Sequence, residues 1–249
     1  MTNRCLSCNH SFKGNYCPNC GQKASVKRLT FSVLLHDLFH FFTHLENGFL
    51  FTTRSFLVKP GVSSTEYISG KRKKYQTPIS YFFIWTSLYI LIHNIIINHY
   101  HYELTGEIVT QMNIKEQSNI FFRQHFTLFI IPVLLLSSFL LYIIMAGSRY
   151  NFIEILMLSL FGTGTYFMMS FVTDFILGFI FKVNVLNANV FLYQGILSSV
   201  YNVWFSYDFF KRTYLPYFWL RLITVSVLIA IGGWLMMFYL PVAWLSWRA

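Results

Sequence analysis

The sequence contains few charged residues and none of the short motifs that mark common enzyme families. Charged side chains make up 11% of its 249 residues, whereas a soluble domain has ~25%. There is no P-loop, no nucleophile elbow, no HExxH motif and no pair of carboxylates at catalytic spacing within the apolar stretches. Apolar residues, in contrast, make up 55% of the chain. The composition therefore predicts a polytopic membrane protein and makes an enzyme the least favoured class of function.

Residues 1–27 lack the apolar core and the small-residue cleavage site of a signal peptide, so we expect them to stay attached. They hold all four cysteines of the chain, arranged as Cys5-x-x-Cys8 and Cys17-x-x-Cys20. Two such turns supply four thiolates that can each lie ~2.3 Å from one Zn²⁺. Two disulfides are the alternative, but the Cys-Pro-x-Cys-Gly pattern and a cytosolic location favour the metal. We predict a zinc ribbon over residues 1–27 with one structural zinc ion.

Residues 31–45 have an amphipathic pattern, with apolar side chains on one face of a helix and polar side chains opposite. The run is too short to cross a bilayer, so we expect it to lie in the membrane interface. On its polar face His36, His40 and His44 follow one another at i, i+4 and i+8, with Asp37 beside them. These residues could form a second metal site or respond to pH. A solvated polar face is the simpler interpretation.

Residues 60–78 carry several local signals. Pro60-Gly61 interrupts the chain, Ser63-x-x-Glu66 has the form of a helix-capping box, and Thr77-Pro78 is typical of a helix start. Between them lies a run of four basic residues, which we expect to contact anionic lipid headgroups. The residues of this basic run are Lys71, Arg72, Lys73 and Lys74.

These motifs occur together in a recognisable order. The first set is Cys5, Cys8, Cys17 and Cys20, and the second is Pro60, Gly61, Tyr67, Ile68, Gly70, Lys71, Arg72, Lys74, Tyr75, Pro78, Tyr81, Phe82 and Phe83. Residues 46–50, Glu-Asn-Gly-Phe-Leu, add an acidic-x-Gly-aromatic-Leu element. In these features the chain resembles bacterial membrane proteins of domain-of-unknown-function family 3667. The resemblance covers roughly the first 90 residues and implies a zinc ribbon followed by several membrane spans, without implying an activity.

Five later stretches are long and apolar enough to cross ~30 Å of hydrocarbon. They cover residues 78–98, 126–146, 155–180, 190–207 and 221–240. With a cytosolic N-terminus, fifteen of the nineteen Lys and Arg residues lie inside and four outside, as the positive-inside rule requires. We therefore predict an all-α protein of the bacterial inner (cytoplasmic) membrane with about five transmembrane helices and an external C-terminus. Residues 28–76 would form a cytosolic, amphipathic interfacial region, and residues 77–249 the transmembrane bundle.

Asp174 is the only acidic residue well inside an apolar run, and ionisable residues at membrane depth are candidates for function. It follows a patch of small residues, 162–165, that would let helices approach closely. Gln194, Asn202 and His93 could line a cavity with Asp174, or could each form an ordinary hydrogen bond between helices. Asp174 could also lie near the outer interface, where a carboxylate stays hydrated.

Three classes of function remain. The first is a non-enzymatic adaptor or regulator that docks a cytosolic protein through its ribbon. The second is a small-molecule or lipid transporter that uses the polar residues of the third and fourth spans. The third is a membrane metalloenzyme centred on the three histidines. The expected partners are a bilayer with anionic headgroups and a cytosolic protein, nucleic acid is not expected, and a homo-oligomer is left open.

Overall fold

The computed structural model describes residues 3–26, 28–33, 48–104, 130–182, 188–213, 215–229 and 231–232. A two-stranded antiparallel sheet lies near the N-terminus, and the rest is mostly helical, which confirms the coarse fold class. The strands are β1 (Asn3–Arg4) and β2 (Ser11–Phe12). The helices are α2 (Phe49–Val58), α3 (Pro60–Ile68), α4 (Pro78–Leu104), α6 (Phe152–Phe175), the π-helix η2 (Ile176–Ile180) and α7 (Ala188–Phe210). Two further apolar helices cover Ile130–Ile144 and Phe218–Ile229.

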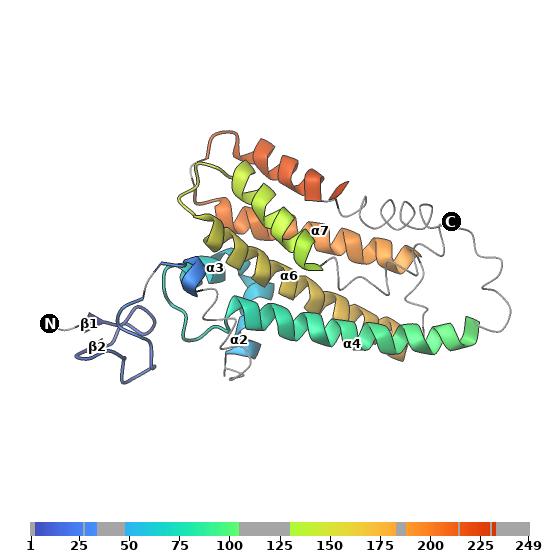
Figure 1. The fold of residues 1–249 in the computed structure, drawn as a ribbon, viewed down its shortest axis with the longest axis horizontal. Coiled ribbons are helices and arrows are strands. Elements are labelled where there is room, and N and C mark those ends of the chain that lie inside the picture. Colours follow the sequence, from blue (N-terminus) through green and yellow to red (C-terminus); the bar gives the residue numbers. More distant parts are fainter. Residues whose placement is uncertain are drawn as a thin grey trace.

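Helices α4 and α6 lie side by side and run in the same direction, with the N-terminal strands beyond one end of the bundle (Figure 1). Near the start of α4, the hydroxyl of Tyr81 lies 3.1 Å from that of Thr165. Twelve residues further along α4, His93 contacts Asp174, nine residues further along α6. Because the contacting residues follow one another in the same direction along both helices, α4 and α6 are parallel.

Helix α7 runs antiparallel to α6. Gln194, near the start of α7, contacts Asp174 near the end of α6. Further along α7, Phe205 packs over Gly162, where an added Cβ would lie 2.7 Å from a carbon of the Phe205 ring. A Cβ at Gly164 would likewise lie 2.8 Å from the Tyr81 ring. The small residues therefore let α4 and α7 approach α6 closely, as the sequence predicts.

Two helical segments among the described residues are long and apolar enough to cross a membrane, Pro78–Ile96 and Phe152–Ile180. The predicted stretch 126–146 is described as the shorter helix Ile130–Ile144, and 221–240 is described only in part. Large apolar side chains are exposed on the outside of all these helices, among them Leu91, Phe139 and Phe179. Such a surface is typical of contact with lipid. The number of spans and their orientation stay predictions.

The helix starts follow local chemistry, with one correction. Helix α4 begins at Pro78, as expected, and the Thr77 hydroxyl donates to Ser80 Oγ at 2.8 Å. The predicted capping box Ser63-x-x-Glu66 is wrong, because α3 already begins at Pro60 and Ser63 donates from within the helix to the carbonyl of residue 59. Proline suits the first position of a helix because its missing N–H would have no intrahelical acceptor there.

Helices α2 and α3 belong to the same hydrophobic core as the long helices. Phe56 of α2 is fully buried and stacks on Phe161 of α6, with ring centroids 4.2 Å apart. Its carbonyl accepts a hydrogen bond from Tyr201 of α7 at 3.2 Å. One cluster of buried apolar residues includes Leu29, Phe56, residues of α4, α6 and α7, and Val225. Residues on both sides of the predicted boundary at 76/77 contribute to this cluster, and the division into an interfacial and a transmembrane region stays a prediction.

The start of α3 docks against the end of α7. The Gly61 N–H donates to Asp208 Oδ2 at 2.7 Å, and Lys211 pairs with the same carboxylate. A carboxylate at a helix N-terminus satisfies a free N–H and interacts favourably with the helix dipole. A Cβ at Gly61 would lie 2.3 Å from the backbone of Asp208, so only glycine fits this contact. The Pro60-Gly61 pair is thus an attachment point between helices and not only a break.

Candidate functional site

The four cysteines converge on one point. Their sulfur atoms all lie within 4.8 Å of one another, with Cys5 Sγ 3.5 Å from Cys20 Sγ and Cys8 Sγ 3.6 Å from Cys17 Sγ. No disulfide links them. Four sulfurs placed tetrahedrally at ~2.3 Å from a zinc ion would be ~3.8 Å apart, close to the observed distances. The donor set therefore fits one metal ion bound by four thiolates.

The two cysteine turns repeat the same backbone pattern. The N–H of Cys5 donates to the carbonyl of His10, and the N–H of Cys17 donates to that of Gln22, each at 2.9 Å. The carbonyls of Cys5 and Cys17 accept from the residues four positions later, Asn9 and Gly21. These two residues have positive φ angles of 61° and 71°, a conformation that asparagine and glycine tolerate best. Local turn chemistry thus places each pair of thiols.

Hydrogen bonds, burial and neighbouring sulfurs shift the pKa values of Cys8 and Cys20 in opposite directions. A hydrogen bond from the His10 backbone lowers the pKa of Cys8 to about 6. Burial, together with the three neighbouring sulfurs, raises the pKa of Cys20 to about 12. Metal binding requires all four thiols as thiolates, so the positive charge of the ion must offset their repulsion.

The ribbon, residues 3–26, sits on the loop between α3 and α4. Leu6 and Val26 pack over Gly70, where an added Cβ would lie 3.0 Å and 3.2 Å from their side-chain carbons. Gly70 has a φ angle of 104°, which other residues rarely adopt. In addition, the Lys73 N–H donates to Gln22 Oε1 at 3.0 Å. Apolar packing and a polar contact together hold the ribbon on this loop.

A second attachment follows the ribbon in sequence. Arg28 donates to both carboxylate oxygens of Glu154, at 2.7 Å and 2.9 Å, and to the carbonyl of Arg149 at 2.8 Å. Glu154 is 2% exposed and also completes a capping box with Asn151 at the start of α6. The Asn151 side chain in turn donates to the Leu29 carbonyl at 3.2 Å. Sequence reasoning missed these contacts, although Asn151-x-x-Glu154 has the capping-box form.

The predicted basic run folds back onto an acidic partner. Glu66 pairs with Lys71 at 3.2 Å and with Lys74 at 2.6 Å, and it accepts a hydrogen bond from the Tyr75 hydroxyl at 2.7 Å. The Arg72 guanidinium lies 5.6 Å from the centre of the Tyr67 ring. Burial acts to raise the pKa of Glu66, but the hydrogen bonds from Lys74, Tyr75 and Lys71 outweigh it and lower that pKa to about 2. The contact with lipid headgroups stays a prediction.

The lowered pKa of Glu66 predicts that the stability of the loop between α3 and α4 depends on pH. The ionised carboxylate stabilises the folded loop above its ordinary pKa of 4.5, and this stabilisation is lost as the pH falls through about 2. Glu66→Gln removes about 1 kcal/mol of pairing, so at pH 5 we expect roughly fivefold faster pepsin cleavage within residues 69–77. The difference from the parent should shrink as the pH approaches 2. The double variant Lys71→Gln/Lys74→Gln should show the same faster cleavage, and Lys73→Gln should not. Equal cleavage rates of Glu66→Gln and the parent at pH 5 would contradict the role of Glu66.

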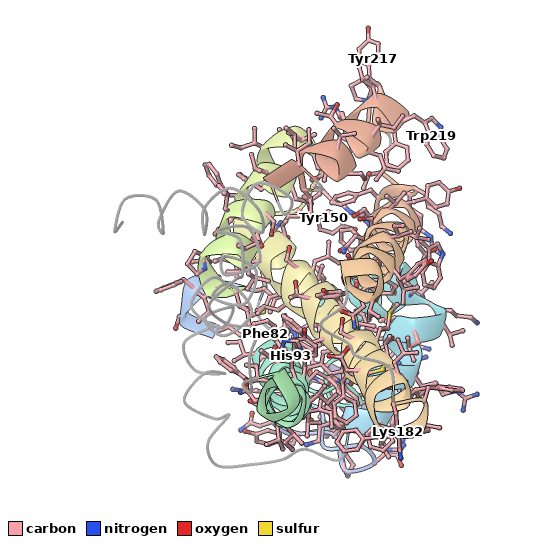
Figure 2. The ribbon with its side chains drawn as sticks, turned by 90° about the vertical axis from the view of Figure 1, so that its right-hand side faces the viewer. Phe82, His93, Tyr150, Lys182, Tyr217 and Trp219 are labelled. Atoms are coloured by element: carbon pink, nitrogen blue, oxygen red, sulfur yellow. The ribbon has the colours of Figure 1, made fainter. Side chains whose placement is uncertain are left out.

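Three long helices contribute to a second, buried cluster. Asp174 of α6 is 1% exposed, its Oδ1 accepts from Gln194 Nε2 of α7 at 2.6 Å, and its Oδ2 lies 3.2 Å from His93 Nδ1 of α4. Figure 2 labels His93 on the side of the α4 ribbon near α6. Asn202 does not join them, since its side chain donates to the Ser198 carbonyl of its own helix at 2.9 Å. Asp174 is therefore buried between helices, and its depth in the membrane stays a prediction.

The predicted histidine site falls outside the described residues. His36, Asp37, His40 and His44 all belong to it. A second metal site there stays a prediction.

Comparison with known proteins finds one family model, and it matches the part of the chain that includes the loop beneath the ribbon. Residues 46–90 match a family model described as "Protein of unknown function (DUF3667)". The match confirms the resemblance to this family. No curated protein and no solved structure matches the chain. The segment that matches DUF3667 spans α2, α3, the basic run and the first half of α4, so it contains Gly61, Glu66 and Gly70, whose contacts are described above.

Proposed function

We propose that the protein is a membrane-anchored adaptor whose metal-bound ribbon docks a cytosolic partner. The observation that supports this proposal is the fixed position of the ribbon. It contacts Gly70 and Lys73 in the loop between α3 and α4, and Arg28 after it pairs with Glu154 at the start of α6. A ribbon on a free tether would not need these contacts. Four thiolates in a tetrahedral arrangement are a typical ligand set for Zn²⁺. Such a closed site leaves no open position for a substrate, so the metal would be structural.

The exposed side of the ribbon indicates the chemistry of the partner. Residues 3–26 contain three basic residues and no acidic one. Arg4, Lys13 and Lys23 are all exposed, and so is the ring of Tyr16, at 62%. Lys23 lies beside Tyr16 through a backbone β-bridge. Exposed aromatic rings and arginines are enriched at protein interfaces, and basic side chains favour a partner of opposite charge. The partner we propose is a cytosolic protein with an acidic patch.

The proposed location is the inner membrane, with the ribbon on the cytosolic side. The parallel pair α4 and α6 and the antiparallel α7 fit an alternating series of spans, because helices one and three of such a series run the same way and helix four runs back. The predicted positive-inside distribution supports this orientation. In it, the basic run and the ribbon both face the anionic inner surface.

Site-specific crosslinking tests the adaptor proposal. A photoreactive amino acid at Tyr16 of the full chain, in living cells, should yield one dominant crosslinked protein. Changing Arg4, Lys13 and Lys23 together to Gln should reduce the crosslink at least tenfold, because it removes the charges that steer an acidic partner. Lys182→Gln/Arg212→Gln, which changes exposed charges far from the ribbon in sequence, is the control and should leave it unchanged. An equal crosslink in the triple variant, or none in the parent, would refute the proposal.

The other two classes of function receive less support. A metalloenzyme would depend on the three histidines that lie outside the described residues. Transport would require Asp174 to be accessible, whereas it is almost fully buried between three helices.

A further inference from the structure

The surface between α7 and the helix Phe218–Ile229 is hollowed into an open groove of about 500 Å³. Along α7 it extends from Ser199 to Tyr207, which is ~12 Å at ~1.5 Å per residue. Apart from Ser199, which hydrogen-bonds the Gly195 carbonyl of its own helix, the lining is apolar or aromatic. It consists of Val200, Val203, Trp204, Tyr207, Trp219 and Leu222. We propose that this groove holds an acyl chain of an anionic phospholipid.

The groove is a recess in an otherwise convex apolar surface. Its lining ranges from Leu222, which is 2% exposed, to Val200 and Trp219, which are each 62% exposed. The rings of Tyr207 and Trp219 stack with centroids 5.3 Å apart, so the two helices that form the groove are in contact there. A recess without polar groups gains dispersion contacts when hydrocarbon fills it. In a bilayer, acyl chains are the apolar material that surrounds the helices.

Positive charge gathers at the Tyr207 end of the groove. The Lys211 ammonium lies 5.6 Å from the centre of the Tyr207 ring, and Arg212 is exposed in the turn after α7. Lys211 is paired with Asp208. Arg212, in contrast, has no carboxylate partner among the described residues. Its charge is therefore available to an anionic headgroup.

Arg221 adds a second positive charge from the other helix, two residues after Trp219. Its guanidinium donates to the carbonyl oxygens of Ile144 and Ala146. These hydrogen bonds hold the side chain in place, but a carbonyl does not neutralise its charge. The groove thus ends at two basic side chains, one from each helix, which suits a lipid with a negative headgroup better than a zwitterionic one.

The basic end of the groove lies on the same side of the bundle as the ribbon, because α7 ends there (Figure 1). Figure 2 labels Tyr217 and Trp219 together at the start of the helix Phe218–Ile229, and such rings are enriched where a membrane meets water. In the proposed orientation this end faces the inner leaflet, which carries the anionic lipids. The inference therefore rests on the proposed membrane location, although not on the adaptor function.

Photolabelling in vesicles tests the proposal. The full chain is placed in phosphatidylcholine vesicles with a small share of phosphatidylglycerol that carries a diazirine in its acyl chain, and labelled residues are identified by mass spectrometry. Label on residues 199–207 and 219–222 should exceed that on the exposed face of α4 around Leu91 at least fivefold. A phosphatidylcholine probe with the same acyl chain should show a clearly smaller excess, because each basic residue strengthens binding of an anionic lipid roughly fivefold.

Two substitutions separate the headgroup contact from the groove itself. Arg212→Gln should reduce the groove label from phosphatidylglycerol roughly fivefold. Lys182→Gln, which changes an exposed lysine after η2, is its control and should leave the label unchanged. Val200→Trp places a large side chain in the groove and should lower the label there to that of the α4 face. Val172→Trp, the same change at an exposed position of α6, should not.

The outcomes distinguish the groove from the membrane location. Equal label on the groove and on the α4 face would overturn the proposal, and so would equal label from the two probes. A groove that stays unlabelled while the α4 face is labelled would mean that a second copy or another segment of this chain covers it, which also overturns the proposal. Absence of label on every helix would contradict the membrane location itself. The vesicles contain no cytosolic protein, so the adaptor proposal does not affect the result.

Discussion

The Cys5→Ser/Cys17→Ser variant is expected to lose its metal ion completely, and with it the fold of residues 3–26. Both side chains are almost fully buried in the ribbon, and each belongs to a different cysteine turn. The ribbon's buried apolar cluster consists of little more than Phe12 and the cysteines, so metal binding must supply most of its folding free energy. Elemental analysis of the purified full chain should give one zinc per parent chain and none for the variant.

His10→Ala is the matched control for this prediction. Histidine is the other common zinc ligand, yet in the ribbon His10 contributes its backbone and its side chain is exposed. The His10→Ala variant should therefore keep one zinc per chain. The helical bundle should stay folded in both variants, as circular dichroism in detergent can show, because its core does not include the cysteines. Zinc retained by the double serine variant would mean that other ligands hold the metal.

Gly61→Ala should be among the most destabilising single substitutions in the helical part of the protein. The added Cβ would lie 2.3–2.5 Å from backbone atoms of Asp208 and Phe209, which cannot rotate away. Helix α3 would have to move off α7 and give up the hydrogen bond from Gly61 to the Asp208 carboxylate. Overpacking and a lost bond to a charged group together cost about 3 kcal/mol or more. Thermal unfolding followed by size-exclusion chromatography in detergent would measure the loss.

Gly195→Ala is the control, since it makes the same substitution on α7, where no described atom outside the local helix backbone lies within 4 Å of the added Cβ. Alanine favours a helix over glycine by up to ~1 kcal/mol, so this variant should be as stable as the parent or slightly more stable. Gly61→Ala with a stability equal to that of Gly195→Ala would contradict the docking of α3 on Asp208.

Features that depend on neighbours in sequence were predictable from the residues alone. The convergence of four thiols follows from two turns that each bring cysteines three residues apart to one side. The start of α4 at Pro78 follows from the fixed φ of proline and the hydroxyl of Thr77. The apolar stretches at 78–98 and 155–180 correspond to long helices because their length and composition suit a span. Local signals also have limits, because Ser63-x-x-Glu66 has the capping form but lies within a helix that already began at Pro60.

The sequence by itself therefore determined which four cysteines could bind a metal ion, the mostly helical class and the start of α4. Only the tertiary structure decided which distant groups meet. Asp174 is 81 residues from His93 and 20 from Gln194, and nothing within a single helix encodes these contacts. Arg28 likewise pairs with Glu154, 126 residues away, and Gly61 donates to Asp208, 147 residues away. Helix propensity and turn chemistry act over a few residues, whereas the pairing of buried charges depends on how whole helices pack.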